Sequence, residues 1–411
     1  MKSKLLKNTI YLYLLTFSSQ LLNLITIPYQ TRVFGPEIYG MVGFAISIMS
    51  YIQLVLDFGF ILSGTESVSS HENNREYLSE IFSIITFYKI ICGIFLIIIL
   101  FILCQIIPSF KHVSLLILLY SIAYWVNALL PDYIYRGLEQ MRYITLRTVL
   151  VKLIFTVLIF VFIHNDSDYI LLPILLLVGN IIAVFISWIN IYKEFGIRYK
   201  KFSFVNFKHE ILKSLPFFCS RIASTAYQAT NTLILGMYFS GQKVVGYYTS
   251  ADKIVSISKS VSSPIADSLY PYMLKNKNYT LIKKILLIYL GFAVLLAPIV
   301  FIFAEKISVI LFGVGYESVG NIVRCLLPTL LVIFPTYIIC FPVLNPLGLS
   351  NYANMSNIFG AVLQILLLLL LILFNQINIY TICISSSITE TSVFVFRLVI
   401  WIKNRQLIKE K

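Results

Sequence analysis

The chain has 411 residues, of which 59% are hydrophobic and only 12% are charged. Soluble globular domains hold about a quarter charged residues, so this composition excludes a soluble protein. The net charge of +14 would suit a nucleic-acid-binding surface, but lysine and arginine also gather on the cytoplasmic loops of membrane proteins. Membrane orientation explains the charge better, and no nucleic-acid partner is expected.

Apolar stretches recur along the whole chain, and each is about as long as the twenty residues that a helix needs to cross the hydrocarbon layer. The first stretch is too long for a signal peptide and lacks a small-residue cleavage site, so we expect a retained span. Polar breaks delimit twelve predicted transmembrane helices: 8–29, 38–62, 80–107, 113–135, 143–163, 169–192, 212–238, 244–273, 280–304, 320–343, 352–374 and 378–402. The predicted fold class is an all-α integral membrane protein.

The loops between these spans alternate in charge. One set is rich in lysine and arginine and includes both termini and the central segment. The other set holds little besides four isolated cations: Arg32, Lys111, Lys243 and Lys306. By the positive-inside rule, both termini and the central segment face the cytoplasm.

The longest basic segment, 193–211, lies almost at mid-chain, which suggests a duplication. A gapless shift of 206 residues places Gly35 on Gly241 and Gly40 on Gly246. Six spans per half is an even number, so the halves enter the membrane in the same sense as parallel repeats. We therefore predict a six-helix lobe at 1–192, a cytoplasmic basic connector at 193–211 and a second six-helix lobe at 212–411, with substrate bound between the lobes.

Polar residues share one face of some predicted spans, at intervals of three and four positions. The span 244–273 has such a stripe: Asp252, Ser256, Lys259, Ser263 and Asp267. The shift of 206 residues matches it to a stripe of the second span: Ser50, Gln53 and Asp57. The span 212–238 adds a third: Arg221, Ser224, Gln228 and Asn231. Such faces are unsuited to lipid, so we expect these helices to line one cavity.

Charged groups in hydrocarbon cost about 3 kcal/mol or more, so an ionisable residue inside a span is a functional candidate. Arg221 and Lys259 are interpreted as anion ligands, because these residue types bind phosphate. For the acids an alternative stays open, in which Asp57 pairs with Arg221 or Lys253, and such ion pairs merely fasten the bundle. The other charged residues lie near estimated span ends or alone on apolar faces, where snorkelling to the interface is the commoner explanation, and they are given no role: Lys89, Asp132, Arg147, Lys152, Arg324, Glu390 and Arg397.

Three segments resemble one protein family in their order and spacing. They are RVFGPEIYG at 32–40 with the following GFAISI and DFGF, VGYYTSADKI at 245–254, and NPLGLSNY from Asn345. The resemblance is to bacterial polysaccharide and O-antigen flippases of the multidrug/oligosaccharidyl-lipid/polysaccharide exporter superfamily. Glu66 departs from the pattern, since members often have a basic residue there, and this argues against a substrate role for its loop.

The resemblance implies a flippase that moves an undecaprenyl-pyrophosphate-linked oligosaccharide repeat unit from the cytoplasmic to the periplasmic leaflet, for O-antigen or capsular polysaccharide synthesis. It implies alternating access around a cationic central cavity in the bacterial cytoplasmic (inner) membrane. The candidate substrate-binding residues are Arg221, Lys259, Arg32, Gln53, Ser256 and Gln228. The candidates for coupling to H⁺ or Na⁺ are Asp57, Asp252 and Asp267. Membrane lipids, a polysaccharide polymerase and a chain-length regulator are candidate partners, and no catalytic residue, cofactor or metal is expected.

Two alternatives stay open at this point. A multidrug or cation exporter of the same superfamily would have the same spans and repeat, but its cavity should be acidic or aromatic. A membrane enzyme, either a glycan polymerase or a polyprenyl-sugar glycosyltransferase, should have a large external loop or paired external acids. The predicted outward loops are all short, which favours a transporter over an enzyme.

Overall fold

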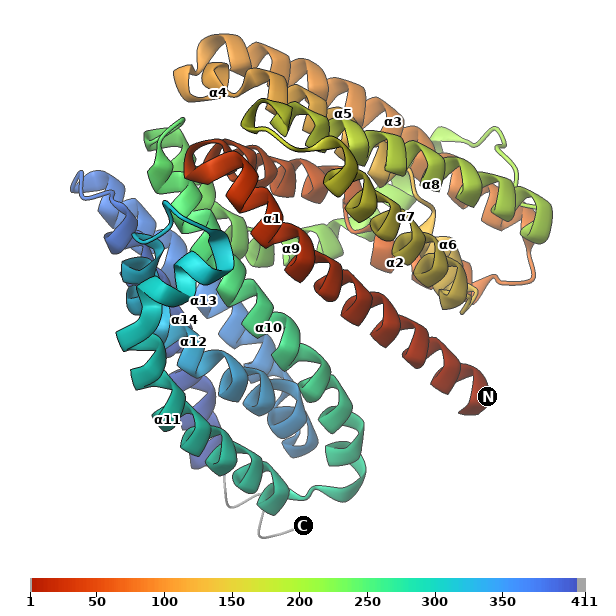
Figure 1. Cartoon of the computed structure of the whole chain (residues 1–411). Coiled ribbons are helices and arrows are strands. Elements are labelled where there is room, and N and C mark those ends of the chain that lie inside the picture. Colours follow the sequence, from red (N-terminus) through yellow and green to blue (C-terminus); the bar gives the residue numbers. More distant parts are fainter. Residues whose placement is uncertain (1, 405–411) are drawn as a thin grey trace. The chain divides into compact units, whose positions relative to one another are not determined.

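The computed structural model describes residues 2–404, with side chains described except at 2–7, 9, 223, 224, 226–228 and 271. Within this range the chain is helical and has no strand (Figure 1). The helices are α1 Lys2–Asp57, α2 Phe60–Ser70, α3 Arg75–Ile106, α4 Pro108–His112, α5 Ser114–Ala128, α6 Asp132–Gly137, α7 Met141–Phe162, α8 Leu171–Phe195, α9 Phe204–Tyr238, α10 Lys243–Asn276, α11 Tyr279–Phe312, α12 Val319–Ile338, α13 Ser350–Leu373 and α14 Ile379–Lys403.

The chain divides into two compact units. Unit 1 comprises Met1–Thr225 and Gly236–Gly241, and unit 2 comprises Ala226–Leu235 and Gln242–Lys411. Both ends of α9 therefore group with unit 1, while its middle groups with unit 2. The lobe boundaries expected from the sequence stay a prediction.

Nine stretches of the described residues are long and apolar enough to cross a membrane. The first extends from Ile10 to Ser70 and includes most of α1 and all of α2, and the others contain α3, α5, α7, α8 and α11 to α14. The helices α9 and α10 have 35 and 34 residues but are not among the nine, because polar residues interrupt their apolar sequence. The protein is therefore an all-α, multi-pass membrane protein, and the count of twelve crossings stays a prediction.

The first long helix bends sharply at a glycine. Gly35 interrupts α1 with φ 66° and ψ 173°, a backbone conformation that side-chain-bearing residues rarely adopt. Gly241, which lies 206 positions later between α9 and α10, has φ 75°. Gly40 is helical and buried. The break predicted between the spans 8–29 and 38–62 is thus a kink at Gly35 rather than a loop.

The shift of 206 residues also matches the bounds of later helices. It carries α3 to 281–312, which lies within α11, and α8 to 377–401, which overlaps α14. It carries the short helix α6 to 338–343, where the chain forms a π-helix at Ile339–Leu344. Helix bounds therefore recur with the period that the sequence suggested.

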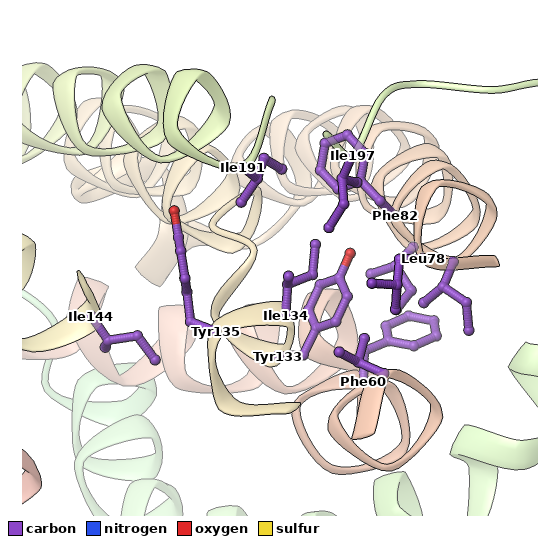
Figure 2. Close-up of a cluster of buried hydrophobic side chains, with 12 residues drawn as sticks. Phe60, Leu78, Phe82, Tyr133, Ile134, Tyr135, Ile144, Ile191 and Ile197 are labelled. Carbon is purple, nitrogen blue, oxygen red and sulfur yellow. The ribbon is translucent and has the colours of Figure 1, made fainter. Parts of the chain in front are cut away.

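The core of unit 1 includes the meeting point of α2, α3 and α6. Phe60 of α2, Leu78 and Phe82 of α3, and Tyr133 of α6 are buried there, and Figure 2 shows these side chains gathered together. Ile197, which follows α8, belongs to the same cluster. The segment after α8 is therefore anchored in unit 1.

The non-helical segment 196–203 between α8 and α9 lies along α3. The backbone N–H groups of Arg198 and Lys200 donate to the hydroxyl oxygens of Ser79 and Ser83, at 3.1 and 2.7 Å. Alternate residues of an extended chain repeat about every 6.6 Å, and residues four apart on a helix about every 6 Å, so the two spacings match. The predicted connector 193–211 therefore has three parts. Its two ends belong to α8 and α9, and its middle, the strap 196–203, is an extended segment that packs against α3.

In unit 2, α12 contains Pro335, which lacks an N–H group. The carbonyl of Leu331, four residues earlier, therefore loses its helical donor. The hydroxyl of Tyr289 in α11 donates to this oxygen at 2.9 Å. Arg397 of α14 donates similarly to the carbonyl of Thr336 at 3.0 Å, so neighbouring helices supply donors where α12 is irregular.

We expect the substitution Tyr289→Phe to lower the melting temperature of the purified protein in detergent. The ring would keep its stack on Phe334, but the Leu331 carbonyl would lose its donor, at a cost of about 1 kcal/mol. The matched control is Tyr352→Phe, at an exposed position, which should melt like the wild type. A wild-type melting temperature for Tyr289→Phe would show that the hydroxyl contributes nothing.

Candidate functional site

Lys259, a predicted anion ligand, pairs with a carboxylate in unit 2. Its Nζ lies 2.7 Å from Oε1 of Glu390 in α14. The side chain of Lys259 is 25% exposed, whereas that of Glu390 is 8% exposed. Snorkelling is therefore wrong for Glu390, which lies near the middle of α14 and holds a cation of the predicted stripe.

Arg221, the other predicted anion ligand, pairs with Asp57 in unit 1. Its Nη1 lies 3.4 Å from Oδ2 of Asp57, the last residue of α1. The two side chains are 38% and 10% exposed, respectively. This pair is one of the alternatives that the sequence left open. Each unit thus presents a partly exposed cation that is held by a buried acid.

Close packing between α2 and α9 positions Arg221. A Cβ atom added to Gly59, at the start of α2, would lie 2.7 Å from the Ser214 carbonyl oxygen and 2.8 Å from Cβ of Phe217. One turn along α2, the hydroxyl groups of Ser63 and Ser214 are 2.6 Å apart. The two helices therefore pack in close contact. Arg221 lies one turn beyond Phe217 on α9, and this contact directs its side chain toward the end of α1.

The other predicted site residues are more scattered. On α10, Ser256 and Asp267 are exposed and Asp252 is partly buried. The hydroxyl of Ser263 donates to Oδ2 of Asp267 at 3.2 Å. Arg32 is exposed on α1, and the side chain of Gln228 lies outside the described part of the chain. The structure brings only Lys259 of the α10 stripe into an ion pair with α14.

Gln53 lies one helical turn before Asp57 on α1. Among the described residues its buried Oε1 has no hydrogen-bond partner. A buried acceptor without a donor costs about 1–3 kcal/mol, so this oxygen is suited to accept from a water or a ligand hydroxyl. Its position places an open acceptor on the same helix face as the Arg221 and Asp57 pair.

For three buried cations snorkelling was the favoured explanation, and it is wrong for them. Lys89, Arg147 and Arg397 are 3%, 9% and 4% exposed. Nζ of Lys89 donates to the Ala128 carbonyl at 2.5 Å, and Arg147 pairs with Asp132 at 2.8 Å. Depth was the available signal, since Lys89 lies near the middle of α3, too far from either end to reach the interface.

A neutral polar network connects α9, α10, α13 and α14 in unit 2. Gln364 donates to Oδ1 of Asn231 at 2.8 Å, and Asn231 donates to the Tyr248 hydroxyl at 3.0 Å. Thr389 donates to Oε1 of Gln364 at 2.7 Å. Because Thr389 precedes Glu390, this network fixes the part of α14 that holds Lys259. The described residues contain no group of three side chains suited to hold a metal ion.

A family model described as "Polysaccharide biosynthesis protein" matches residues 5–277 of the chain. The chain belongs to this family. The match extends from the first turn of α1 to the end of α10. It therefore contains Asp57, Arg221 and Lys259. The family predicted from the three sequence segments is confirmed.

Two relatives of this chain have the name "Putative O-antigen transporter". The one from Escherichia coli (strain K12) is 27% identical over 287 residues, which cover 70% of this chain and 69% of the relative. The one from Shigella dysenteriae is 24% identical over 398 residues, which cover 95% and 98%. Both names describe transporters, in agreement with the prediction that the chain is not an enzyme.

Two solved structures share the fold of this chain. The lipid II flippase MurJ, in its inward closed conformation, has a TM-score of 0.74 at 16% identity, over 98% of this chain and 90% of that chain. An inward-facing multidrug resistance MATE family transporter of the MOP superfamily has a TM-score of 0.66 at 16% identity, over 95% of both chains. At such identity the likeness shows the fold alone.

Proposed function

We propose that this protein flips an undecaprenyl-pyrophosphate-linked oligosaccharide repeat unit from the cytoplasmic to the periplasmic leaflet of the bacterial inner membrane, for O-antigen or capsular polysaccharide synthesis. The observation that carries the proposal is the pair of partly exposed cations, Arg221 and Lys259, in a multi-pass member of the polysaccharide biosynthesis family. Arginine and lysine in such helices suit an anionic headgroup and are unsuited to acyl chains.

In this proposal twelve helices cross the membrane as two parallel six-helix repeats, 1–192 and 212–411, with the connector 193–211 and both termini in the cytoplasm. The recurrence of helix bounds after 206 residues supports the repeat, as do the positive φ angles of Gly35 and Gly241. Alternating access around a cationic central cavity would move the headgroup, while the polyprenyl tail stays in lipid.

The two ion pairs suggest how the headgroup is bound and released. A pyrophosphate can displace Asp57 from Arg221, because the guanidinium offers two parallel N–H groups to phosphate oxygens. It can likewise displace Glu390 from Lys259. When the headgroup leaves, each acid takes its cation back, which favours release. The buried acids thus compete with the ligand and keep binding reversible.

The remaining site residues have supporting roles in the proposal. Hydroxyl and amide groups of the stripe would bind the sugar moieties, and Arg32 would meet the headgroup near the outer mouth. These supporting residues are Arg32, Gln53, Ser256 and Gln228. H⁺ or Na⁺ coupling is assigned to three acids: Asp57, Asp252 and Asp267. The flipped unit would pass to a polysaccharide polymerase with its chain-length regulator.

The leaflet in which lipid-linked units accumulate after gene deletion tests the proposal. We expect surface polysaccharide to disappear, units to accumulate in the cytoplasmic leaflet, and drug tolerance to stay unchanged. Units accumulating in the periplasmic leaflet would indicate a polymerase instead. Normal surface polysaccharide with reduced drug tolerance would indicate an exporter. Leaflet position is measured by the access of a membrane-impermeant oxidant to the sugars in spheroplasts.

A further inference from the structure

Behind the ion pair of unit 1 lies a second, fully buried cation. Lys89 of α3 is buried. The hydroxyl of the preceding Tyr88 donates to the Val55 carbonyl at 3.1 Å, so this part of α3 lies beside the end of α1, and the acids near the charge of Lys89 include Asp57 and Asp132. Among the described residues, no carboxylate oxygen lies within 4.0 Å of its Nζ, which instead contacts the Ala128 carbonyl and lies 5.8 Å from the centre of the Tyr133 ring. In order of decreasing exposure, the charges are therefore cation, acid, cation: Arg221, Asp57, Lys89.

Unit 2 has the same order of charges. Lys259 is partly exposed, Glu390 is buried, and the buried Arg397 lies two helical turns along α14 on the face of Glu390. Arg397 donates to the carbonyl of Thr336, next to Tyr337, and the charges of Lys259 and Glu390 lie near the same tyrosine. The acceptors of Arg397 are neutral: Ser356 Oγ at 2.7 Å, the Thr336 carbonyl at 3.0 Å and Asn357 Oδ1 at 2.6 Å.

Burying the inner cations Lys89 and Arg397 without an acid in contact lowers the stability of the protein, so we expect a function that offsets this cost. A buried charge without an opposite charge in contact is unfavourable, even when neutral groups accept its hydrogen bonds. The buried acids Asp57 and Glu390 explain why a second cation is useful in each unit. If a ligand draws the outer cation away, the buried acid loses its partner, and breaking a buried pair in this way is strongly destabilising. A second cation near the acid reduces that cost.

We propose that Lys89 and Arg397 are reserve counter-ions, positioning residues that balance Asp57 and Glu390 while Arg221 and Lys259 bind a pyrophosphate headgroup. This inference rests on the proposed function and deepens it. The reserve counter-ions do not touch the ligand. They lower the cost of freeing the outer cations, so ligand affinity depends on them. A purely structural cation would affect stability but leave the affinity of the folded protein unchanged.

Binding of inorganic pyrophosphate to the purified full-length protein in detergent tests the inference, by calorimetric titration together with the melting temperature of each variant. Lys89→Met should raise the dissociation constant by about tenfold, because Asp57 then depends on Arg221 alone. Asp57→Asn and the double variant Asp57→Asn/Lys89→Met should bind at least as tightly as the wild type, because the carboxylate of Asp57 then no longer competes with the ligand for Arg221. The matched control, Lys152→Met, replaces a partly buried lysine of α7 in the same unit and should bind like the wild type.

The second unit provides an independent test, which decides the matter if Lys89→Met does not fold. Arg397→Met should weaken binding by about tenfold, Arg397→Lys should restore most of the affinity, and Glu390→Gln/Arg397→Met should bind at least as tightly as the wild type. Wild-type dissociation constants for Lys89→Met and Arg397→Met, with lowered melting temperatures, would overturn the inference. Unchanged binding in Arg221→Gln and Lys259→Gln would instead overturn the pyrophosphate site itself.

Discussion

Replacing Arg221 and Lys259 together by Gln should abolish surface polysaccharide while the protein still reaches the membrane. Each charge-assisted hydrogen bond contributes about 1.5–3 kcal/mol, so losing both cations should weaken headgroup binding by about 100-fold or more. Lipid-linked units should then accumulate in the cytoplasmic leaflet of cells that have only the variant protein. Surface polysaccharide is measured by gel electrophoresis, and the amount of transporter by immunoblot of membranes.

A cation of similar exposure outside the site provides the control. Arg324 of α12 is 25% exposed and pairs with Glu305 at 2.7 Å, as Lys259 does with Glu390. Arg324→Gln should leave surface polysaccharide unchanged, which separates the loss of a site cation from the loss of any ion pair. Normal export by the Arg221→Gln/Lys259→Gln protein would contradict a role for these cations in binding the headgroup.

The substitution Gly59→Val should strongly destabilise unit 1. Gly59 has φ 78°, which a β-branched residue adopts only with strain, and the added atoms would overlap the backbone of α9. Strain and overpacking each cost about 1–3 kcal/mol, so the sum is about 3 kcal/mol or more. The expected result is a large fall in the melting temperature in detergent and in the amount of membrane-inserted protein.

Gly291→Val is the matched control, because no atom lies within 4 Å of a Cβ atom added at Gly291. It should melt within a few degrees of the wild type, in line with about 1 kcal/mol or less for a helical glycine. If Gly59→Val melts at the same temperature as Gly291→Val, α2 and α9 do not pack as closely as described, and the positioning of Arg221 needs another explanation.

Composition and hydropathy were sufficient to predict the fold class. Helices that face lipid need long apolar sequences, and these are visible in the sequence. Hydropathy alone failed where polar residues interrupt an apolar run. In α10 a polar stripe between Asp252 and Asp267 lowers the mean hydropathy, so only periodicity marks it as a candidate span. In α1 the kink at Gly35 leaves the helix almost continuous, so a predicted pair of spans becomes a single run.

The site could be predicted only in part, for a related reason. Spacing of three and four residues places Lys259 in a stripe on one helix, and the sequence of that helix is enough to find it. Its partner Glu390 lies on another helix, and a single sequence does not specify which helix faces are in contact. Lys89 was misjudged because the cost of burying its charge depends on depth, which a few residues of error in a span end obscure.

The division of α9 between the two units has a consequence for hybrid proteins. The strap 196–203 looks like a natural place to join the first half of one homologue to the second half of another. Such a joint would set Gly59 from one parent against Ser214 and Phe217 from the other, at separations that allow no extra atom. If the two parents differ at these positions, α2 and α9 of the hybrid will not pack together, even though each half folds well in its own parent.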